Sequence, residues 1–271
     1  MIDKDYLKFS SYWKVISDKT GYDFSGYSTE SLNIRLEKFI SSESIGSPEE
    51  LKDKLYSDKI IQEKILGRIL INYTEMFRDP GFFLSIRRCV IPYLATHQSI
   101  NIWHAGCSSG EEVYSLAIIL DELGLLNRCN IYATDINELN LRNASSGIYP
   151  LQRMQESASR YFSAGGINNL SKYYTAYYDH VIFSGRLKDR IKFIPHNLVS
   201  DAAPNMFHLI LCRNVFIYFN QQMQRIVMKE LSNCLYDNGY LGIGILEQYV
   251  DFANERLEVV DRHNKIYRKT L

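Results

Sequence analysis

The stretch that decides the fold is residues 100–120, INIWHAGCSSGEEVYSLAIIL. Its first six residues form a short apolar run, and the small residues of 106–110, GCSSG, follow directly. Apolar residues then recur from Val113 to Leu123 at the three- and four-residue spacing of a helix. We therefore predict a strand, a tight turn of small residues and a helix, in that order.

The turn has the composition of a ligand-binding turn. Small residues let the backbone approach a ligand closely, and the start of the following helix offers unpaired N–H groups. The turn contains no lysine for a phosphate, and Glu111 and Glu112 would repel one. Acidic residues there suit an amine-bearing ligand such as the methionine part of S-adenosylmethionine (SAM). The alternative is an ordinary tight turn whose acids stabilise the helix N-terminus.

Asp135 follows the next predicted strand, which runs from Asn130 to Thr134. It lies 23 residues after Glu112. An acid at about this distance past a glycine-rich turn commonly accepts hydrogen bonds from ribose hydroxyls. Aspartate is also a good helix N-cap, and this second interpretation stays open.

Strand-like and helix-like segments alternate along the rest of the chain. We predict strands at 190–194, 207–212 and 239–245, and helices at 139–144 and 221–235. This alternation favours the α/β class, with a mostly parallel, Rossmann-like sheet. Residues 151–190 interrupt it with a tyrosine-rich stretch, which we predict to be a small inserted subdomain, part helical and part short antiparallel strand.

The first 75 residues have a different pattern. Apolar residues recur near helical spacing, and Ser47, followed by Pro48 and two glutamates, marks a helix start. We predict a small N-terminal all-helical domain over 1–75, which faces the substrate. The second domain spans 76–271 and contains the insertion.

The composition excludes several classes of partner. Lys plus Arg equals Asp plus Glu, at 31 each, so no global field attracts nucleic acid or anionic lipid. We expect no nucleic-acid partner, no membrane insertion, no signal peptide and a cytoplasmic location. The five scattered cysteines include no CxxC pair, so we expect neither a metal site nor disulfides.

Two further segments place polar residues beside the predicted sheet. Residues 72–80, NYTEMFRDP, lie at the expected domain boundary, where Thr and Arg side chains can close over a ligand. In residues 207–219, FHLILCRNVFIYF, the strand delivers Arg213 and Asn214 to the carboxyl edge of the sheet, and Tyr218 follows. The plainer interpretations are a linker with a salt-bridged arginine and a packing role for the aromatic residues.

Together these motifs resemble those of the chemotaxis receptor methyltransferases, the CheR family. The resemblance covers nearly the whole chain. Six matching segments stand in the family's order: TEMFRDPGFF (74–83), WHAGCSSGEEVYS (103–115), ATDI (133–136), ASSGIY (144–149), NL (197–198) and CRNVFIYF (212–219).

The resemblance implies a SAM-dependent protein-glutamate O-methyltransferase. Such an enzyme forms glutamate methyl esters on a chemoreceptor-like signalling protein and releases S-adenosylhomocysteine (SAH). The implied fold is a small helical domain followed in the sequence by a Rossmann-like methyltransferase domain. We expect a monomer with no metal.

The resemblance also implies the role of each site residue. Asp135 would hold the ribose, Asn197 and Leu198 the adenine edge, and Glu112 the methionine portion. Arg78 and Tyr218 would be catalytic, beside the sulfonium and the incoming carboxylate. The full implied cofactor set is Asn72, Thr74, Arg78, Ala105, Glu112, Asp135, Asn197, Leu198, Arg213 and Asn214.

This chain departs from the family pattern at three places. Val113 replaces a usual proline, and Ile245-Leu246 replace a usual His-Ser pair before Glu247. The helix expected near residues 31–40 carries only Arg35 and Lys38 as bases. Two other functions therefore stay open: a methyltransferase of the same fold acting on another protein or a small molecule, and a catalytically silent module that binds SAM or SAH.

Arg35 and Lys38 lie three residues apart, hence on one helical face. We expect this face to meet an acidic receptor helix. The alternative is a solvated helix in which Arg35 pairs with Glu30 or Glu37 of its own domain.

Overall fold

The computed structural model describes residues 9–20, 22–69, 74–247 and 256–270. Among these, no helix is long and apolar enough to span a membrane. The chain divides into two compact units: Met1–Ile71 with Ile217–Arg225, and Asn72–Phe216 with Ile226–Leu271.

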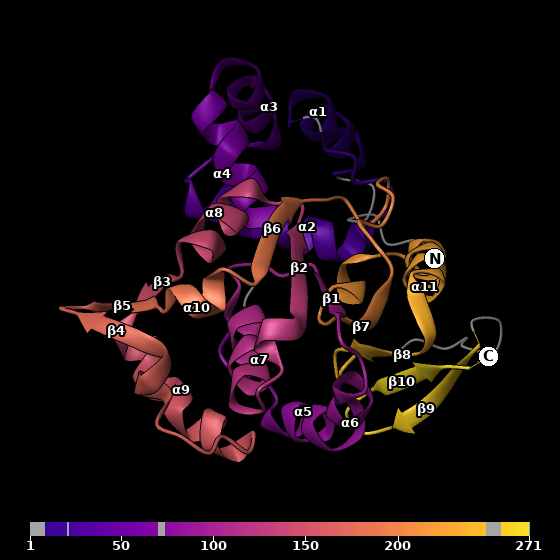
Figure 1. Cartoon of the computed structure of the whole chain (residues 1–271). Coiled ribbons are helices and arrows are strands. Elements are labelled where there is room, and N and C mark those ends of the chain that lie inside the picture. The colour runs from indigo at the N-terminus through magenta and orange to yellow at the C-terminus, as the bar shows by residue number, and fades with distance from the viewer. Residues whose placement is uncertain (1–8, 21, 70–73, 248–255, 271) are drawn as a thin grey trace. The chain divides into compact units, whose positions relative to one another are not determined.

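The N-terminal part of the first unit is helical, as the spacing of its apolar residues predicts (Figure 1). Serine side chains begin two of its helices, because Ser28 accepts from the Ser31 N–H and Ser47 from the Glu50 N–H. The second helix buries Leu32, Leu36 and Phe39. The helices are α1 (Ser10–Thr20), α2 (Thr29–Ser42), α3 (Pro48–Ser57) and α4 (Lys59–Ile69).

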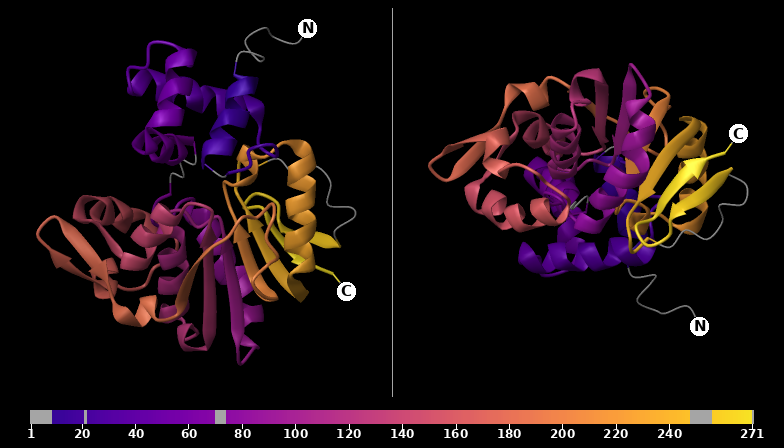
Figure 2. Two further views of the ribbon diagram at one scale, coloured as in Figure 1. Left: turned by 90° about the horizontal axis from the view of Figure 1, so that it is seen from above. Right: turned by 60° about the horizontal axis from the view of Figure 1, so that its bottom comes forward.

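A seven-stranded sheet forms the centre of the second unit, in the order β6-β2-β1-β7-β8-β10-β9 (Figures 1 and 2). The first five strands of that order are mutually parallel, and β10 is antiparallel to both β8 and β9. The prediction of an α/β fold with a mostly parallel sheet is confirmed. The strands are β1 (Ile100–Ala105), β2 (Cys129–Asp135), β6 (Ile191–Pro195), β7 (Phe207–Cys212), β8 (Leu235–Ile243), β9 (Leu257–Asp261) and β10 (Ile266–Lys269).

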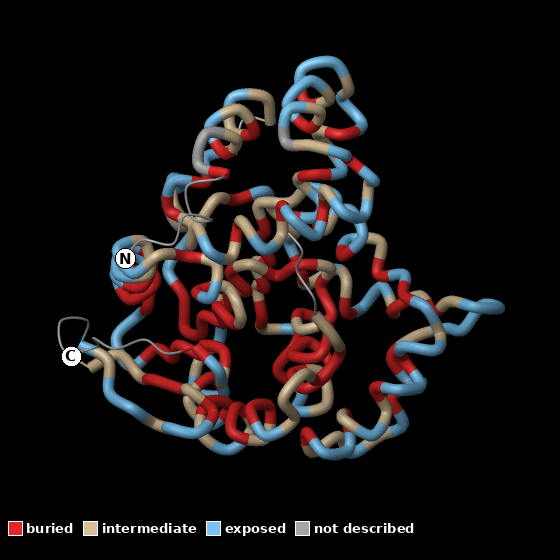
Figure 3. Tube along the Cα trace, turned by 180° about the vertical axis from the view of Figure 1, so that it is seen from behind, coloured by how far each residue is buried: buried red, intermediate tan, exposed pale blue. Residues whose placement is uncertain are grey.

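Helices surround this sheet, and the most central is α7 (Glu111–Glu122), which is buried over nearly its whole length (Figure 3). Such a helix is apolar on all sides and packs as part of the core. The other helical segments of the second unit are α5 (Pro80–Ser85), the π-helical turn η2 (Ile86–Val90), α6 (Ile91–Ala95), η3 (Leu126–Arg128), α8 (Glu138–Ser146) and the later part of α11 (Gln221–Asn233). The start of α11 and most of η5 (Phe216–Tyr218) belong to the first unit.

The segment expected as an insertion holds a separate three-stranded antiparallel sheet, in the order β3-β5-β4, and its hairpin projects from the unit (Figure 1). Glu122 at the end of α7 anchors this region, because it accepts hydrogen bonds from the hydroxyls of Tyr161 and Tyr173. Its elements are β3 (Ile148–Pro150), α9 (Leu151–Ser163), η4 (Leu170–Tyr173), β4 (Tyr174–Tyr177), β5 (His180–Phe183) and α10 (Gly185–Lys188).

The chain division differs from the expected continuous domains of 1–75 and 76–271. Residues 217–225 leave the second unit and complete the first. Tyr27 and Phe219 form an antiparallel bridge with rings 5.5 Å apart, and the Asn220 N–H donates to the Gly26 carbonyl. These contacts join residues about 190 positions apart, so no local pattern in the sequence announces them.

Candidate functional site

The turn after β1 is shaped by two glycines with positive φ, Gly106 at +80° and Gly110 at +91°. A Cβ on Gly106 would lie 2.5 Å from Val215 Cγ2, and one on Gly110 would lie 2.8 Å from Ala144 Cβ. Both positions therefore need glycine for conformation and for space. The turn is tied to the neighbouring strand because the N–H groups of Gly106 and Cys107 donate to the Thr134 carbonyl, both at 2.8 Å.

Asp135 stands at the end of β2, buried beside this turn. One carboxylate oxygen accepts from the Ser108 N–H and the other from the Asn137 N–H, each at 2.8 Å. Burial raises the pKa of Asp135 above its ordinary value. A carboxylate has about four acceptor positions, so these bonds are compatible with additional donors such as ribose hydroxyls. The ribose role of Asp135 stays a prediction.

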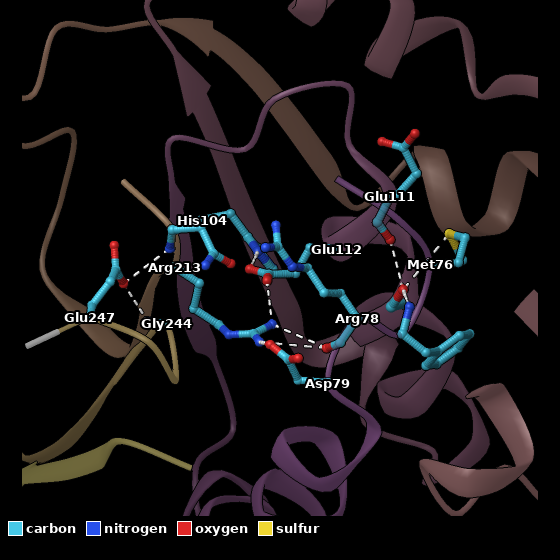
Figure 4. Close-up of polar contacts among 12 residues, drawn as sticks. Met76, Arg78, Asp79, His104, Glu111, Glu112, Arg213, Gly244 and Glu247 are labelled. Carbon is cyan, nitrogen blue, oxygen red and sulfur yellow. Dashed lines mark hydrogen bonds and ion pairs between the residues drawn. The ribbon is translucent and has the colours of Figure 1, made fainter. Parts of the chain in front are cut away.

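Glu112, in the first turn of α7, is the centre of a buried ionic cluster (Figure 4). Its carboxylate accepts from Arg213 Nη1 at 2.7 Å and lies 3.3 Å from His104 Nδ1. Burial alone would raise the pKa of Glu112, but the Arg213 charge and the His104 contact outweigh burial and lower it. Glu112 therefore stays ionised, and its charge is compensated within the protein.

Arg213 links this cluster to the segment before α5. Its side chain is 1% exposed, and its Nη2 donates to Asp79 Oδ2 at 2.6 Å. Both terminal nitrogens also donate to the backbone carbonyl of Arg78, at 3.4 and 3.5 Å (Figure 4). Its guanidinium carbon lies 4.0 Å from the centroid of the Phe82 ring. One buried arginine thus fixes the backbone at Arg78, a residue expected to be catalytic.

The same segment is anchored a second time, through Phe77. This ring is fully buried and packs 5.2 Å from Tyr161 and 5.6 Å from Phe83. The Phe77 N–H donates to Ser115 Oγ of α7 at 2.9 Å. Phe77 is therefore a structural anchor that fixes the position of the backbone next to Arg78.

Glu111 points away from the Glu112 cluster, a distinction the sequence did not predict (Figure 4). Its carboxylate accepts from Ser109 Oγ at 2.7 Å and lies 3.6 Å from Arg153 of α9. Burial raises its pKa. Glu111 and Thr74 line a hollow together with Arg153 and Arg160. Of the residues expected near the domain boundary, Thr74 thus borders this hollow, and Asn72 lies outside the described residues.

The adenine-edge candidates follow β6, the strand next to β2. Pro195 pairs with Asp135 in the sheet register, and the His196 N–H donates to the Asp135 carbonyl. Asn197 and Leu198 come directly after and are half-buried. The Asn197 side-chain oxygen accepts from the Val199 N–H at 2.9 Å, so this side chain shapes its own turn.

Ala105 is the last residue of β1, and Asn214 lies two residues after the end of β7. Ala105 is buried and pairs with Thr134. Asn214 has φ of +60°, and its N–H donates to the buried carboxylate of Glu247. The second unit thus brings together the ends of β1, β2, β6 and β7, each carrying candidate residues.

Tyr218 belongs to the first unit. The Arg35 guanidinium lies over its ring, 4.2 Å from the centroid, and its carbonyl accepts from the Ser28 N–H at 2.8 Å. Arg35 also donates to the Ile69 carbonyl. Arg35 is therefore engaged inside its unit, with neither of the glutamates considered as partners, whereas Lys38 is exposed.

Over the described ranges, no three His, Cys, Asp or Glu side chains gather in an arrangement that suits a metal. His104 and His196 are buried, and burial lowers the pKa of His196. Sequence reasoning gave no role to Asp79, which accepts a hydrogen bond from Arg213. Its position next to Arg78 in the matching segment was the signal available.

Comparison with known proteins identifies the family of this chain. Residues 72–266 match the family model described as "CheR methyltransferase, SAM binding domain". The chain is 38% identical, over its full length and 95% of the relative, to a Pseudomonas putida protein described as a methyltransferase, Cher3. It is 29% identical to a chemotaxis protein methyltransferase of Listeria innocua, over 99% of this chain and 98% of the relative. It is 31% identical to chemotaxis protein methyltransferase 1 of Pseudomonas aeruginosa, over 79% of this chain and 80% of the relative. The chain belongs to the CheR methyltransferase family.

Proposed function

We propose that this protein transfers the methyl group of SAM to a glutamate side chain of a chemoreceptor-like signalling protein, forming a methyl ester. The observation that carries the proposal is the convergence of the glycine turn, Asp135 and the Arg213–Glu112 pair at one edge of the sheet. This is the edge at which α/β folds bind ligands. Family membership supports the same cofactor and acceptor.

The residues present fit the cofactor. Gly106 and Gly110 give the turn after β1 its positive-φ conformation, and Asp135 is a buried acceptor for ribose hydroxyls. We assign the adenine edge to Asn197 and Leu198 and the methionine portion to Glu112. Asn72, Thr74, Arg78, Ala105, Arg213 and Asn214 complete the proposed contacts.

The reaction needs no general base. The side chain of a solvent-exposed glutamate has a pKa of about 4.3 and is ionised at neutral pH, so the nucleophile is ready. When bound, SAM supplies a methyl group on a positively charged sulfur, and the S–C electron pair stays on sulfur as the methyl passes to the carboxylate oxygen. The protein contributes alignment of the carboxylate and removal of its water.

Arg78 and Tyr218 are the proposed catalytic residues. An arginine fork matches a carboxylate, and a tyrosine hydroxyl can align one of its oxygens. Arg78 orients the carboxylate without neutralising it, since full charge pairing would weaken the nucleophile.

The test is transfer of a methyl-tritium label from SAM to the cytoplasmic fragments of candidate receptors. We expect the label to be released by mild base, as methyl esters are. A base-stable label would show a different acceptor chemistry, and SAH binding without transfer to any receptor would indicate a regulatory module. We also propose that the enzyme is cytoplasmic and monomeric. Light scattering during size-exclusion chromatography measures its mass and tests the second point.

A further inference from the structure

Glu247, just beyond the end of β8, is a buried acid without a role in the proposed chemistry. It is 2% exposed. Its Oε2 accepts from the N–H groups of Asn214, at 3.0 Å, and Gly244 (Figure 4). Its Oε1 accepts from the Phe216 N–H at 2.8 Å. One carboxylate therefore joins the loop after β7 to the turn after β8.

The loop held in this way has an uncommon backbone conformation. Asn214 has φ of +60°, in the left-handed region that asparagine enters more readily than most residues other than glycine. The space around it is closed, because a Cβ on Gly244 would lie 2.6 Å from Glu247 Oε2 and 2.9 Å from the Asn214 nitrogen. The acid, the glycine and the loop fit one another closely.

This loop carries the contacts that order the candidate site. Arg213, its first residue, binds Glu112 at 2.7 Å and Asp79 at 2.6 Å. Val215, two residues later, occupies the space that a Cβ on Gly106 would need. A shift of the loop would therefore move the partner of Glu112 and loosen the packing against the turn after β1.

We infer that Glu247 is a positioning residue for cofactor binding, which holds residues 213–216 in the shape that presents Arg213 and Asn214. This inference rests on the proposed function, since it takes Arg213 and Asn214 as SAM contacts. The role requires a carboxylate. An ionised carboxylate is acceptor-only, whereas the amide of a glutamine would turn an N–H₂ group toward backbone N–H groups.

The experiment compares Glu247→Gln with Glu122→Gln, measuring SAH affinity by calorimetry and stability by thermal unfolding. Glu122 is the matched control, because its buried carboxylate also accepts several hydrogen bonds. These bonds join α7 to η2 and to the inserted region and do not involve residues 213–216. We expect Glu247→Gln to weaken SAH binding at least about tenfold, as expected when a buried acceptor is lost. Glu122→Gln should lower the melting temperature and keep SAH affinity within about twofold, since distant sites act independently.

Two further variants separate the possible failures. Gly244→Ala retains the Glu247 carboxylate but forces a methyl group against its Oε2 and against the Asn214 nitrogen. It should therefore also weaken SAH binding, and it decides the question if Glu247→Gln does not fold. Asn214→Ala tests the underlying assignment. If this variant binds SAH with unchanged affinity, the loop does not contact the cofactor and the proposed site is wrong.

Two outcomes would overturn the role of Glu247 alone. The first is weakened SAH binding in Asn214→Ala together with parental binding in Glu247→Gln or Gly244→Ala. Equal losses of affinity in Glu247→Gln and Glu122→Gln would also overturn it.

Discussion

Asp135 combines two tasks in a single carboxylate. It fixes the turn after β1 through the Ser108 N–H, and we propose that it also holds the ribose. Asp135→Ala should weaken SAH binding by roughly 1.5–3 kcal/mol, the range for a hydrogen bond to a charged group or a buried group left unpaired. Calorimetry measures this, with Asp18→Ala on α1, an exposed position, as the control. Unchanged affinity in Asp135→Ala would rule out the ribose assignment.

Arg78 is predicted to act on the acceptor more than on the cofactor. Arg78→Ala should lower turnover on the order of 100-fold, the cost of a misplaced reactant, and should keep much of the SAH affinity. The Arg213 bonds to the Arg78 carbonyl involve the backbone and survive the substitution. Initial rates and SAH titrations measure the two effects, with exposed Arg88→Ala as the control. Equal losses in both would make Arg78 a cofactor ligand or a structural residue.

The sequence predicts which residue types reach the site but not how they pair. Glu112 and Arg213 were both expected at the carboxyl edge of the sheet, one after β1 and one after β7. Their ion pair spans 101 residues, and the pair of Arg213 with Asp79 spans 134. Such partners depend on the order of the strands in the sheet, which local patterns do not contain.

At the scale of elements, the buried strands were the most predictable. The predicted strands at 100–105 and 207–212 match β1 and β7, whose residues are almost all buried and form continuous apolar runs. β8 begins at Leu235, four residues before the predicted start, because the polar residues Asp237 and Asn238 conceal its first half. The edge strand β9 and its neighbour β10 were missed, because β9 has no fully buried residue and β10 has only four residues, two of them basic.

Helix α2 carries a prediction about Arg35 and Lys38. Arg35→Ala should lower turnover by roughly 2- to 30-fold, the equivalent of one cation–π contact, because the Tyr218 ring loses its support. Lys38→Ala, on the same face but exposed, should have a small effect that depends on salt, as expected of a charge at the rim of an interface. Initial rates of receptor methylation over a salt series measure both.

The salt series separates support of Tyr218 from receptor docking. A deficit in Arg35→Ala that is constant across the series indicates support of the ring, since the contact is internal. A deficit that disappears at high salt in both variants would instead make the two bases a docking face for an acidic receptor helix.

At the scale of the whole molecule, His208 should make stability depend on pH. Burial, reinforced by the nearby His97, lowers the pKa of His208 from 6.5 to about 4. Between these values the unfolded chain binds a proton that the folded protein does not. The free energy of unfolding should therefore fall as the pH drops from about 6.5 to about 4.

His208→Asn tests this dependence. The asparagine oxygen can replace Nδ1 as acceptor for the Asn101 N–H, and it does not titrate. Urea unfolding at a series of pH values should show a shallower slope in this window than the parental protein. Exposed His263→Asn should keep the parental slope, and a parental slope in His208→Asn would contradict the prediction.

The course of the chain between the two units has a consequence for biosynthesis. The first unit includes Ile217–Arg225, which the ribosome makes 146 residues after Ile71. At about 5–20 residues per second, the helices wait roughly 7–30 seconds for their last segment. The N-terminal helices are thus made first, but their unit is completed only after most of the sheet has been synthesised. A chimaera that exchanges the helices of two relatives must therefore exchange residues 217–225 as well.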